Sequence, residues 1–287
     1  MGRRENALRH VARDGHGVEI GPSHNPIAPK RDGFKVHVID HATRAELRHK
    51  YATEPVALDN IEEVDFVWRG ERYAELTGRP HFYDWVIASH VIEHSPDLIA
   101  FLEDCDSLLK DGGVLSLVVP DKRYCFDRFR PLTGLARIID AHLAANKLHS
   151  QGSVAEYFMN VVSKGGRGAW DAGSAGEYRF YHTDKDAIEG MRLVREDKAY
   201  LDIHNWCFVP HSFRLAIEDL HTLGFTKLRE VDFIPTQGFE FFMTLGRHGA
   251  GPRMSRLDML RAIDREVGAA DEGMVARLRG WLARLRR

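Results

Sequence analysis

Three histidines and two acids stand where apolar runs end, and these residue types could move a proton or bind a metal. His90, Glu93 and His94 directly follow the run DWVIAS. If a helix begins near His90, the i, i+3 and i+4 spacings place the three side chains on one face. Imidazole and carboxylate groups together suit zinc, manganese or iron, and histidine is also the usual general base near neutral pH. The sequence therefore predicts proton chemistry or a metal at this point.

Asp121 and His204 are the other candidates for the proton. Asp121 follows the apolar run VLSLVVP, where it could position a hydroxyl, and Lys122 or Arg123 could hold an anion. The alternative for this stretch is a charged surface turn. His204 lies within YLDIHNWCFVP, where a polar group needs a hydrogen bond, so a core histidine is the alternative to a general base.

A turn near the N-terminus could bind a nucleotide. In GVEIGPSHNPIAPK, Glu19 and Gly21 close an apolar run, and Asp40 ends the run VHVID. In Rossmann-like domains glycines let the backbone approach a cofactor, and an acid about 20 residues further on binds ribose hydroxyls. An acid at a strand end can also simply cap the next helix. We expect Asp40 to bind ribose.

These residues require strands that bring their ends together. Short apolar runs alternate with helical patterns through the first part of the chain, which predicts parallel βαβ units and a ligand site at the carboxyl ends of the strands. We expect strands at Gly17–Ile20, Lys35–Ile39, Glu63–Val67, Trp85–Ser89 and Val114–Val119. The clearest helix is Pro96–Leu109, ended by the glycines of KDGG.

The remainder of the chain divides into three parts. Residues 122–200 carry aromatics, glycines and charges without a strand rhythm, and we expect an insertion that builds or covers a pocket. A helix at Pro210–Leu223 precedes strands at Thr226–Asp232 and Phe239–Gly246, which should pair antiparallel because no helix separates them. We therefore expect one domain over residues 1–250 and a basic helical tail over 251–287.

Composition limits the classes of partner. The 287 residues have a formal net charge of −2 and three scattered cysteines, so we expect neither a nucleic-acid surface nor a disulfide framework. The sequence shows no apolar window of membrane-spanning length, and we expect a cytoplasmic protein. The tail's apolar stripes predict a packing or homo-oligomer helix in preference to a membrane-surface helix.

A family resemblance rests on four stretches. VEIG, VID, DWVIASHVIEHSPD and LLKDGGVLSLVVPD resemble the class I S-adenosylmethionine-dependent methyltransferases, in particular their small-molecule branch. The resemblance covers roughly residues 17–121. It implies a Rossmann-like, doubly wound sheet of seven mostly parallel strands with an antiparallel last strand. It also implies that S-adenosylmethionine is the cofactor, bound by Glu19, Gly21, Ser23, Asn25, Asp40 and Ser89.

The first turn departs from this family's pattern E-x-G-x-G-x-G. Ser23 and Asn25 occupy the second and third glycine positions. Asn25 tolerates left-handed backbone angles and could keep the turn. Pro26 and Pro29 should shorten the helix that usually follows. We expect a divergent cofactor loop, and the alternative is a domain that has lost or altered its use of the cofactor.

The resemblance also bears on the metal and on the reaction. Some O-methyltransferases of the ubiquinone pathway and of small RNA carry E-x-x-E-H and bind a divalent metal, but here His90 replaces the first acid, and many metal-free relatives also carry E-H. We therefore favour a base among His90, His94, Asp121 and His204 and predict no metal ligands. The expected reaction is O-methylation of a small sugar-like or other polar molecule. The alternative is a non-catalytic or repurposed binding domain.

Overall fold

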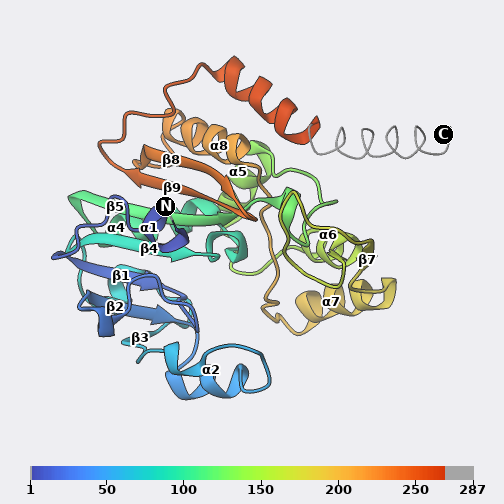
Figure 1. Cartoon of the computed structure of the whole chain (residues 1–287), viewed down its shortest axis with the longest axis horizontal. Helices are drawn as coiled ribbons and strands as arrows, with labels where there is room; N and C mark the ends of the chain where they lie inside the picture. Colours follow the sequence, from blue (N-terminus) through green and yellow to red (C-terminus); the bar gives the residue numbers. More distant parts are fainter. Residues whose placement is uncertain (1, 269–287) are drawn as a thin grey trace.

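A single sheet forms the centre of the computed structural model, which describes residues 2–268. The sheet has seven strands in the order β3-β2-β1-β4-β5-β9-β8. The strands are β1 (His16–Ile20), β2 (Lys35–Asp40), β3 (Phe66–Val67), β4 (Tyr83–Ser89), β5 (Leu109–Pro120), β8 (Arg229–Gln237) and β9 (Glu240–Gly246). β9 runs antiparallel between β5 and β8, and the other neighbouring pairs are parallel. The predicted fold class and the predicted antiparallel pair are confirmed (Figure 1).

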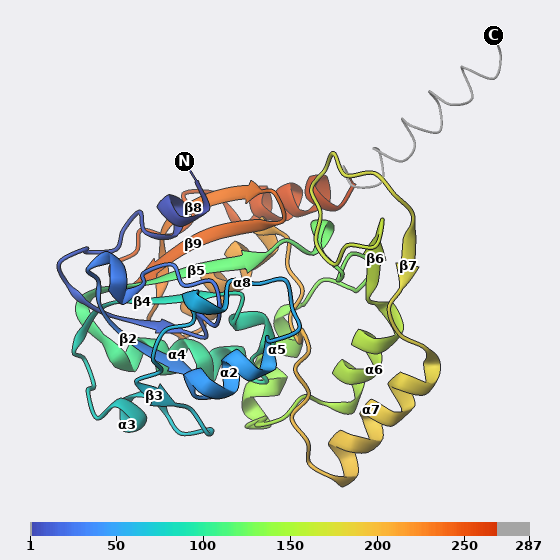
Figure 2. The ribbon, with the colours of Figure 1, turned by 60° about the horizontal axis from the view of Figure 1, so that its bottom comes forward.

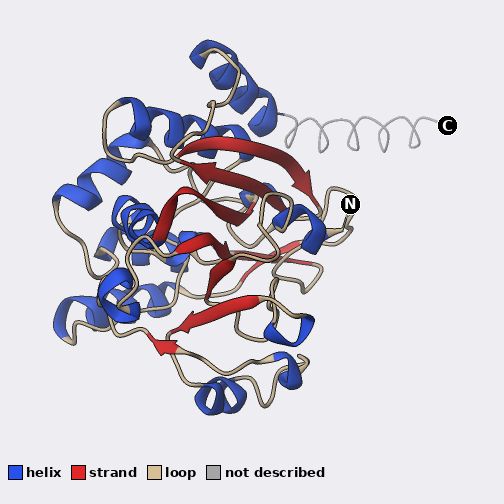
Figure 3. Cartoon of the chain, turned by 90° about the vertical axis from the view of Figure 1, so that its left-hand side faces the viewer, coloured by secondary structure: helices blue, strands red, loops and turns tan. Residues whose placement is uncertain are grey.

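Helices and loops cover both faces of the sheet (Figure 3). One face packs against α3 (Tyr73–Thr77), α4 (Leu98–Leu108), α5 (Leu135–Leu143) and α8 (Pro210–Thr222), and this side holds the larger core. The other face is covered by α1 (Arg3–Ala7) and by apolar residues of the 27–36 segment. α2 (Arg44–Lys50) follows β2. The connection from β1 to β2 therefore covers this face of the sheet with loop residues. In a βαβ unit a helix usually occupies this place.

The helix before β5 is shorter than predicted at both ends. Asp97 caps α4, its side chain accepting a hydrogen bond from Ala100 N at 2.9 Å, so the helix begins at Leu98. Gly112 and Gly113 belong to β5, and neither has a positive φ. The prediction that these glycines end the helix is therefore wrong. The chain turns instead at Leu109, which is already extended.

The inserted segment forms a small unit beyond the carboxyl end of β5. It contains α6 (Gln151–Asn160), α7 (Asp184–Glu196) and a two-stranded sheet of β6 (Val162–Lys164) and β7 (Tyr178–Phe180). Val154, Val194 and Ile203 form a separate apolar cluster within it. Figure 2 shows this unit beside the main sheet.

A further helix at residues 256–268 lies along α8. Glu266 accepts hydrogen bonds from His211 N and His211 Nδ1 at the start of α8, and Arg256 pairs with Asp219 near its end. The predicted second apolar stripe, and the oligomer contact expected from it, lie at 269–287, outside the described residues. Within the described part of the chain, none of the helices combines the length and apolar character needed to cross a membrane.

Candidate functional site

The carboxyl ends of β1, β2 and β4 lie side by side. β1 pairs with β2 on one side and with β4 on the other. The chain therefore continues from β1 to one side of the sheet through β2 and β3, and then returns to the other side of β1 at β4. In open α/β sheets ligands bind at such a switch point. The residues that follow these strands are Gly21, His41 and His90, and each begins a turn.

The turn after β1 is unusual in both backbone and side chains. Gly21 and Ser23 have φ angles of +60° and +48°, so Ser23 takes the left-handed position that the sequence assigned to Asn25. Asn25 is exposed, and its N–H closes a turn on Pro22 O. The helix expected after this turn is reduced to a 3₁₀ turn at Lys30–Asp32, as the prolines predict.

The Glu19 side chain binds the backbone of this loop. Its carboxylate is buried and accepts hydrogen bonds from Ile27 N at 2.5 Å and Ala28 N at 3.0 Å. Burial raises the pKa of Glu19 to about 7, against the lowering effect of these two backbone bonds. Glu19 therefore fixes the path of the loop; its predicted contact with a cofactor stays a prediction.

This raised pKa should make stability depend on pH. Because the folded protein holds the Glu19 proton more tightly than the unfolded chain, the stabilisation is complete below pH 4.5 and is lost as pH rises through about 7. Relative to Glu19→Gln, the wild type should lose up to about 3 kcal/mol across this window. Urea unfolding at a series of pH values measures the difference. Glu54→Gln, at an exposed acid, should leave the profile unchanged, and parallel profiles for wild type and Glu19→Gln would contradict the assignment.

Asp40 lies at the end of β2 and contacts the same loop. Its side chain is only 1% exposed. Oδ1 accepts from His41 N at 2.7 Å, and Oδ2 accepts from Ser23 N at 3.3 Å. The structure thus brings the acid and the divergent turn together. Ribose binding by Asp40 stays a prediction, because here its oxygens hold the protein backbone.

The end of β4 carries a charged cluster that includes a residue from the N-terminus. Arg3 donates to Ser89 Oγ at 2.6 Å and to Glu240 at 2.9 Å. His90 Nε2 lies 2.7 Å from Glu240 Oε2. Burial lowers the pKa of His90, but Glu240 and Glu93 outweigh it and raise the pKa to about 9. His90 is therefore charged at neutral pH, which does not suit its predicted role as a base.

The expected helix from His90 does not form. His90 has a φ of +55°, and Ile92–His94 is a single 3₁₀ turn. Even so, His90 Nδ1 lies 3.5 Å from Glu93 Oε1. Burial raises the pKa of the Glu93 carboxyl, but the neighbouring His90 outweighs it and holds the pKa below its usual value. Glu93 is thus a fully buried charged group.

His204 reaches this point from the far end of the insertion. Its Nε2 lies 3.9 Å from Glu93 Oε1, and its ring packs edge-on against that of His94 with centroids 4.6 Å apart. His204 Nδ1 lies 2.5 Å from Asp127 Oδ2, and His94 Nδ1 lies 2.9 Å from Asp202 Oδ1. The structure therefore brings the His94 and His204 rings together, and the Nδ1 atom of each ring lies beside a carboxylate.

Asp127 and Arg130 were not predicted from the sequence. Asp127 Oδ1 accepts from Arg130 Nη1 at 2.8 Å, and Arg130 also donates to Glu156 at 3.0 Å and to His204 O at 2.7 Å. Burial raises the pKa of the Asp127 carboxyl, but His204 and Arg130 outweigh it and hold the pKa well below its usual range. The signal for these residues was a charged pair within the aromatic run YCFDRFR.

Asp121 is fully buried and engaged by its neighbours. It accepts from Arg123 Nε at 2.9 Å and from Thr236 Oγ1 at 2.5 Å. The prediction that Asp121 positions a substrate hydroxyl remains untested, and its contacts here connect the end of β5 to the β8–β9 hairpin.

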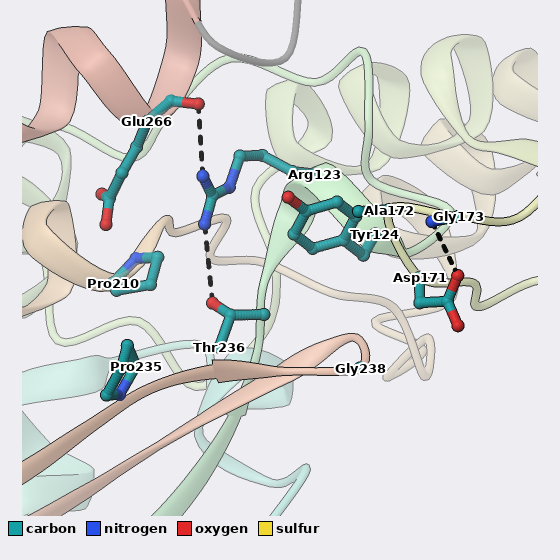
Figure 4. A pocket seen from close by; sticks show the side chains of 10 residues that line it. All are labelled: Arg123, Tyr124, Asp171, Ala172, Gly173, Pro210, Pro235, Thr236, Gly238 and Glu266. Atoms are coloured by element: carbon teal, nitrogen blue, oxygen red, sulfur yellow. Dashed lines mark hydrogen bonds between the residues drawn. The ribbon is translucent and has the colours of Figure 1, made fainter. Parts of the chain in front are cut away.

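A cavity of about 530 Å³ is lined in part by Arg123 and Thr236, the two side chains that bind Asp121. Figure 4 shows the Arg123 guanidinium between Glu266 and Thr236, with a hydrogen bond to each. Other aromatic and basic residues of the insertion lie outside the lining of the cavity: Trp170 is buried, and Arg179 and Tyr181 are exposed. The cavity lies between the insertion, the β8–β9 hairpin and the 256–268 helix.

Comparison with known proteins agrees with this architecture. The sheet order, with its antiparallel β9 and the polar turns at its switch point, defines the Rossmann-like class of α/β proteins. A family model described as a methyltransferase domain matches residues 3–163, more than half of the chain. The chain therefore belongs to the methyltransferase-domain family. Among curated proteins, none matches the sequence.

Solved structures resemble the chain at low identity. The trans-methyltransferase CalH in complex with SAH is 12% identical, with a TM-score of 0.40, 84% of this chain covered and 53% of CalH. The chain thus spans about half the length of CalH. A protein from Rhodobacter sphaeroides described as a Zn-dependent alcohol dehydrogenase is 14% identical, with a TM-score of 0.44 and coverages of 86% and 90%. A SAM-dependent methyltransferase from Thermotoga maritima is 17% identical, with a TM-score of 0.31 and coverages of 66% and 69%.

Proposed function

We propose that this protein transfers a methyl group from S-adenosylmethionine to a hydroxyl oxygen of a small polar molecule. Membership of the methyltransferase-domain family supports the reaction class. The observation that carries the oxygen acceptor is the position of Glu93, His94 and His204, one short turn beyond the carboxyl end of β4. A hydroxyl acceptor must lose a proton during transfer, and these groups can accept one or stabilise the alkoxide.

The residues of the switch point fit the proposed cofactor. The left-handed Gly21 and Ser23 turn the backbone above β1, and Asp40 lies within hydrogen-bond distance of that turn. The 3.3 Å bond from Ser23 N is the longer of the two backbone contacts of Asp40. To bind the ribose hydroxyls, Asp40 Oδ2 would release Ser23 N and accept a hydrogen bond from the ribose in its place. The cofactor supplies an activated methyl group on a sulfonium.

The protein's own contribution is alignment and proton handling. In-line transfer to a good leaving group needs little covalent work, so positioning supplies most of the acceleration. The buried Asp127 holds the His204 ring by Nδ1, which leaves Nε2 facing Glu93. The cavity lined by Arg123, Tyr124 and Thr236 offers polar contacts that suit a sugar-like acceptor.

Tritiated S-adenosylmethionine tests the acceptor class. The enzyme should label members of a panel of sugars and sugar acids, and the label should resist mild alkali as a methyl ether does. Labelling of amines alone would show that the reaction is methyl transfer but that the oxygen acceptor is wrong.

One observation favours the second candidate, a domain that has altered its use of the cofactor. The Asp40 carboxylate is nearly inaccessible and is already bonded to the loop. If this bond does not exchange, the ribose has no acid to bind. Calorimetry with S-adenosylhomocysteine separates the two candidates, because only the first binds this compound at the β1 turn.

A further inference from the structure

The Glu93 carboxylate is buried and has no hydrogen-bond partner among residues 2–268. Its exposed fraction is 0%, and within the described residues neither of its oxygens accepts a hydrogen bond. The nearest side-chain nitrogens that the structure gives are His90 Nδ1 at 3.5 Å and His204 Nε2 at 3.9 Å. Burying a charged group is costly unless it is paired or coordinates a metal. His90, which Glu93 shares with Glu240, is the nearest positive group that the structure gives, and it reaches one of the two Glu93 oxygens, so the carboxylate can still take a further positive partner.

Two histidines present their rings to the same point. One potential ligand atom from each of Glu93, His94 and His204 lies within 4.8 Å of the other two. His204 Nδ1 forms a hydrogen bond with Asp127 Oδ2 at 2.5 Å, whereas His94 Nδ1 lies 2.9 Å from Asp202 Oδ1 without hydrogen-bond geometry. Carboxylates that accept from the outer nitrogen of a histidine orient the other nitrogen toward a metal. The arrangement thus contains the ligands and the groups that would orient them.

We infer that Glu93, His94 and His204 bind one divalent transition-metal cation of the Zn²⁺ or Co²⁺ type. Two imidazoles and one carboxylate suit these borderline cations, whereas Mg²⁺ and Ca²⁺ prefer sites made of oxygen. Three protein ligands leave coordination positions open, which is typical of catalytic sites. His90 is held by Glu240 and stays outside the ligand set.

Metal binding requires the three ligand atoms, which lie within 4.8 Å of one another, to move closer together. Bonds of about 2.0–2.2 Å to a tetrahedral cation require ligand atoms about 3.3 Å apart. His204 Nε2 and Glu93 Oε1 are already 3.9 Å apart. The His94 side chain is 27% exposed, so an ion can reach the site past this ring.

This inference departs from the sequence-based preference for a base without a metal, which stays a prediction. H-x-x-E-H supplies only two suitable ligands within one turn, and the third lies 110 residues further along the chain, counted from His94 to His204. A metal at this point would also stabilise the alkoxide of the acceptor. That catalytic role rests on the proposed function; the metal site itself does not.

Metal titration of the chelator-treated full-length protein tests the inference. Co²⁺ should bind one per chain, give a visible absorption band and raise the Tm, and Zn²⁺ should displace it. Glu93→Gln and His204→Asn should each weaken Co²⁺ binding at least 100-fold. His142→Asn is the matched control, because His142 Nδ1 also lies 3.0 Å from a carboxylate, Asp97, but His142 is outside this cluster.

Two results would overturn the inference. The first is no uptake of Co²⁺ or Zn²⁺ by the wild type at millimolar concentration. The second is equal Co²⁺ affinity in the wild type and in Glu93→Gln. Because glutamine keeps the shape of the glutamate side chain, this variant still tests the inference if His204→Asn fails to fold. Binding of S-adenosylhomocysteine by the metal-free protein would leave the proposed function standing in either case.

Discussion

Replacing Asp127 with asparagine should lower the free energy of unfolding by about 3–5 kcal/mol, the cost of breaking a buried ion pair. Asp127 and Arg130 are each 1% exposed, and the Asp127 carboxylate also binds His204. The amide keeps the size of the side chain but removes the charge that compensates the guanidinium. Glu156 alone then neutralises Arg130 from a partly exposed position. Urea unfolding at neutral pH measures the loss.

Asp59→Asn is the control for this substitution. Asp59 pairs with Arg48, but its side chain is 97% exposed. Exposed pairs contribute about 0–1 kcal/mol, so this variant should be close to the wild type. If the two substitutions cost the same, Asp127 is not the buried counter-charge on which Arg130 depends.

Gly17→Ala should destabilise the protein by about 3 kcal/mol or more through overpacking. Gly17 lies opposite Trp85 in the β1–β4 pair, and a Cβ at this position would lie 2.1 Å from the indole ring. Trp85 is fully buried and donates from Nε1 to Ala12 O, so the ring has nowhere to move. The fall in Tm is the simplest readout.

Two comparisons isolate this contact. Gly112→Ala, in β5, places its Cβ in open space and should cost little. In a Trp85→Leu background the added methyl of Gly17→Ala should cost less than about 1 kcal/mol, because contacting residues are not additive. An equal cost of Gly17→Ala in both backgrounds would show that the indole is not the cause.

The strands were predictable because their signal is local. Parallel strands buried on both faces read as continuous apolar runs, and VHVID and DWVIAS match β2 and β4 closely. The turn residues were less predictable. The sequence indicates a divergent loop after β1, but it does not show that Ser23, whose N–H bonds to Asp40, takes the left-handed position and Asn25 does not.

The candidate site was only partly predictable because its partners are distant in the chain. Glu93 and His94 are adjacent in sequence, whereas His204, Asp127 and Glu240 arrive through the insertion and β9. Sequence spacing placed His90 on a shared helical face, but the backbone at His90 is left-handed. The pairing with Glu240, which makes His90 a charged group, has no local signature.

The most direct measurement for the whole account is calorimetric titration of the full-length protein with S-adenosylhomocysteine. A cofactor site at the β1 turn predicts a dissociation constant in the micromolar range, about −8 kcal/mol. Asp40→Asn should weaken binding by about 1–3 kcal/mol, the range for a hydrogen bond to a charged group.

Asp84→Asn supplies the matched control for this titration. Asp84 also accepts a hydrogen bond from a backbone N–H, that of His16 at 2.9 Å, but this contact lies at the amino ends of β1 and β4, away from the β1 turn. Its affinity should equal that of the wild type. A micromolar constant that Asp40→Asn weakens and Asp84→Asn does not is the result that the account predicts. No heat of binding up to about 1 mM, where the affinity is only about −4 kcal/mol, would contradict the assignment of this protein as an S-adenosylmethionine-dependent methyltransferase.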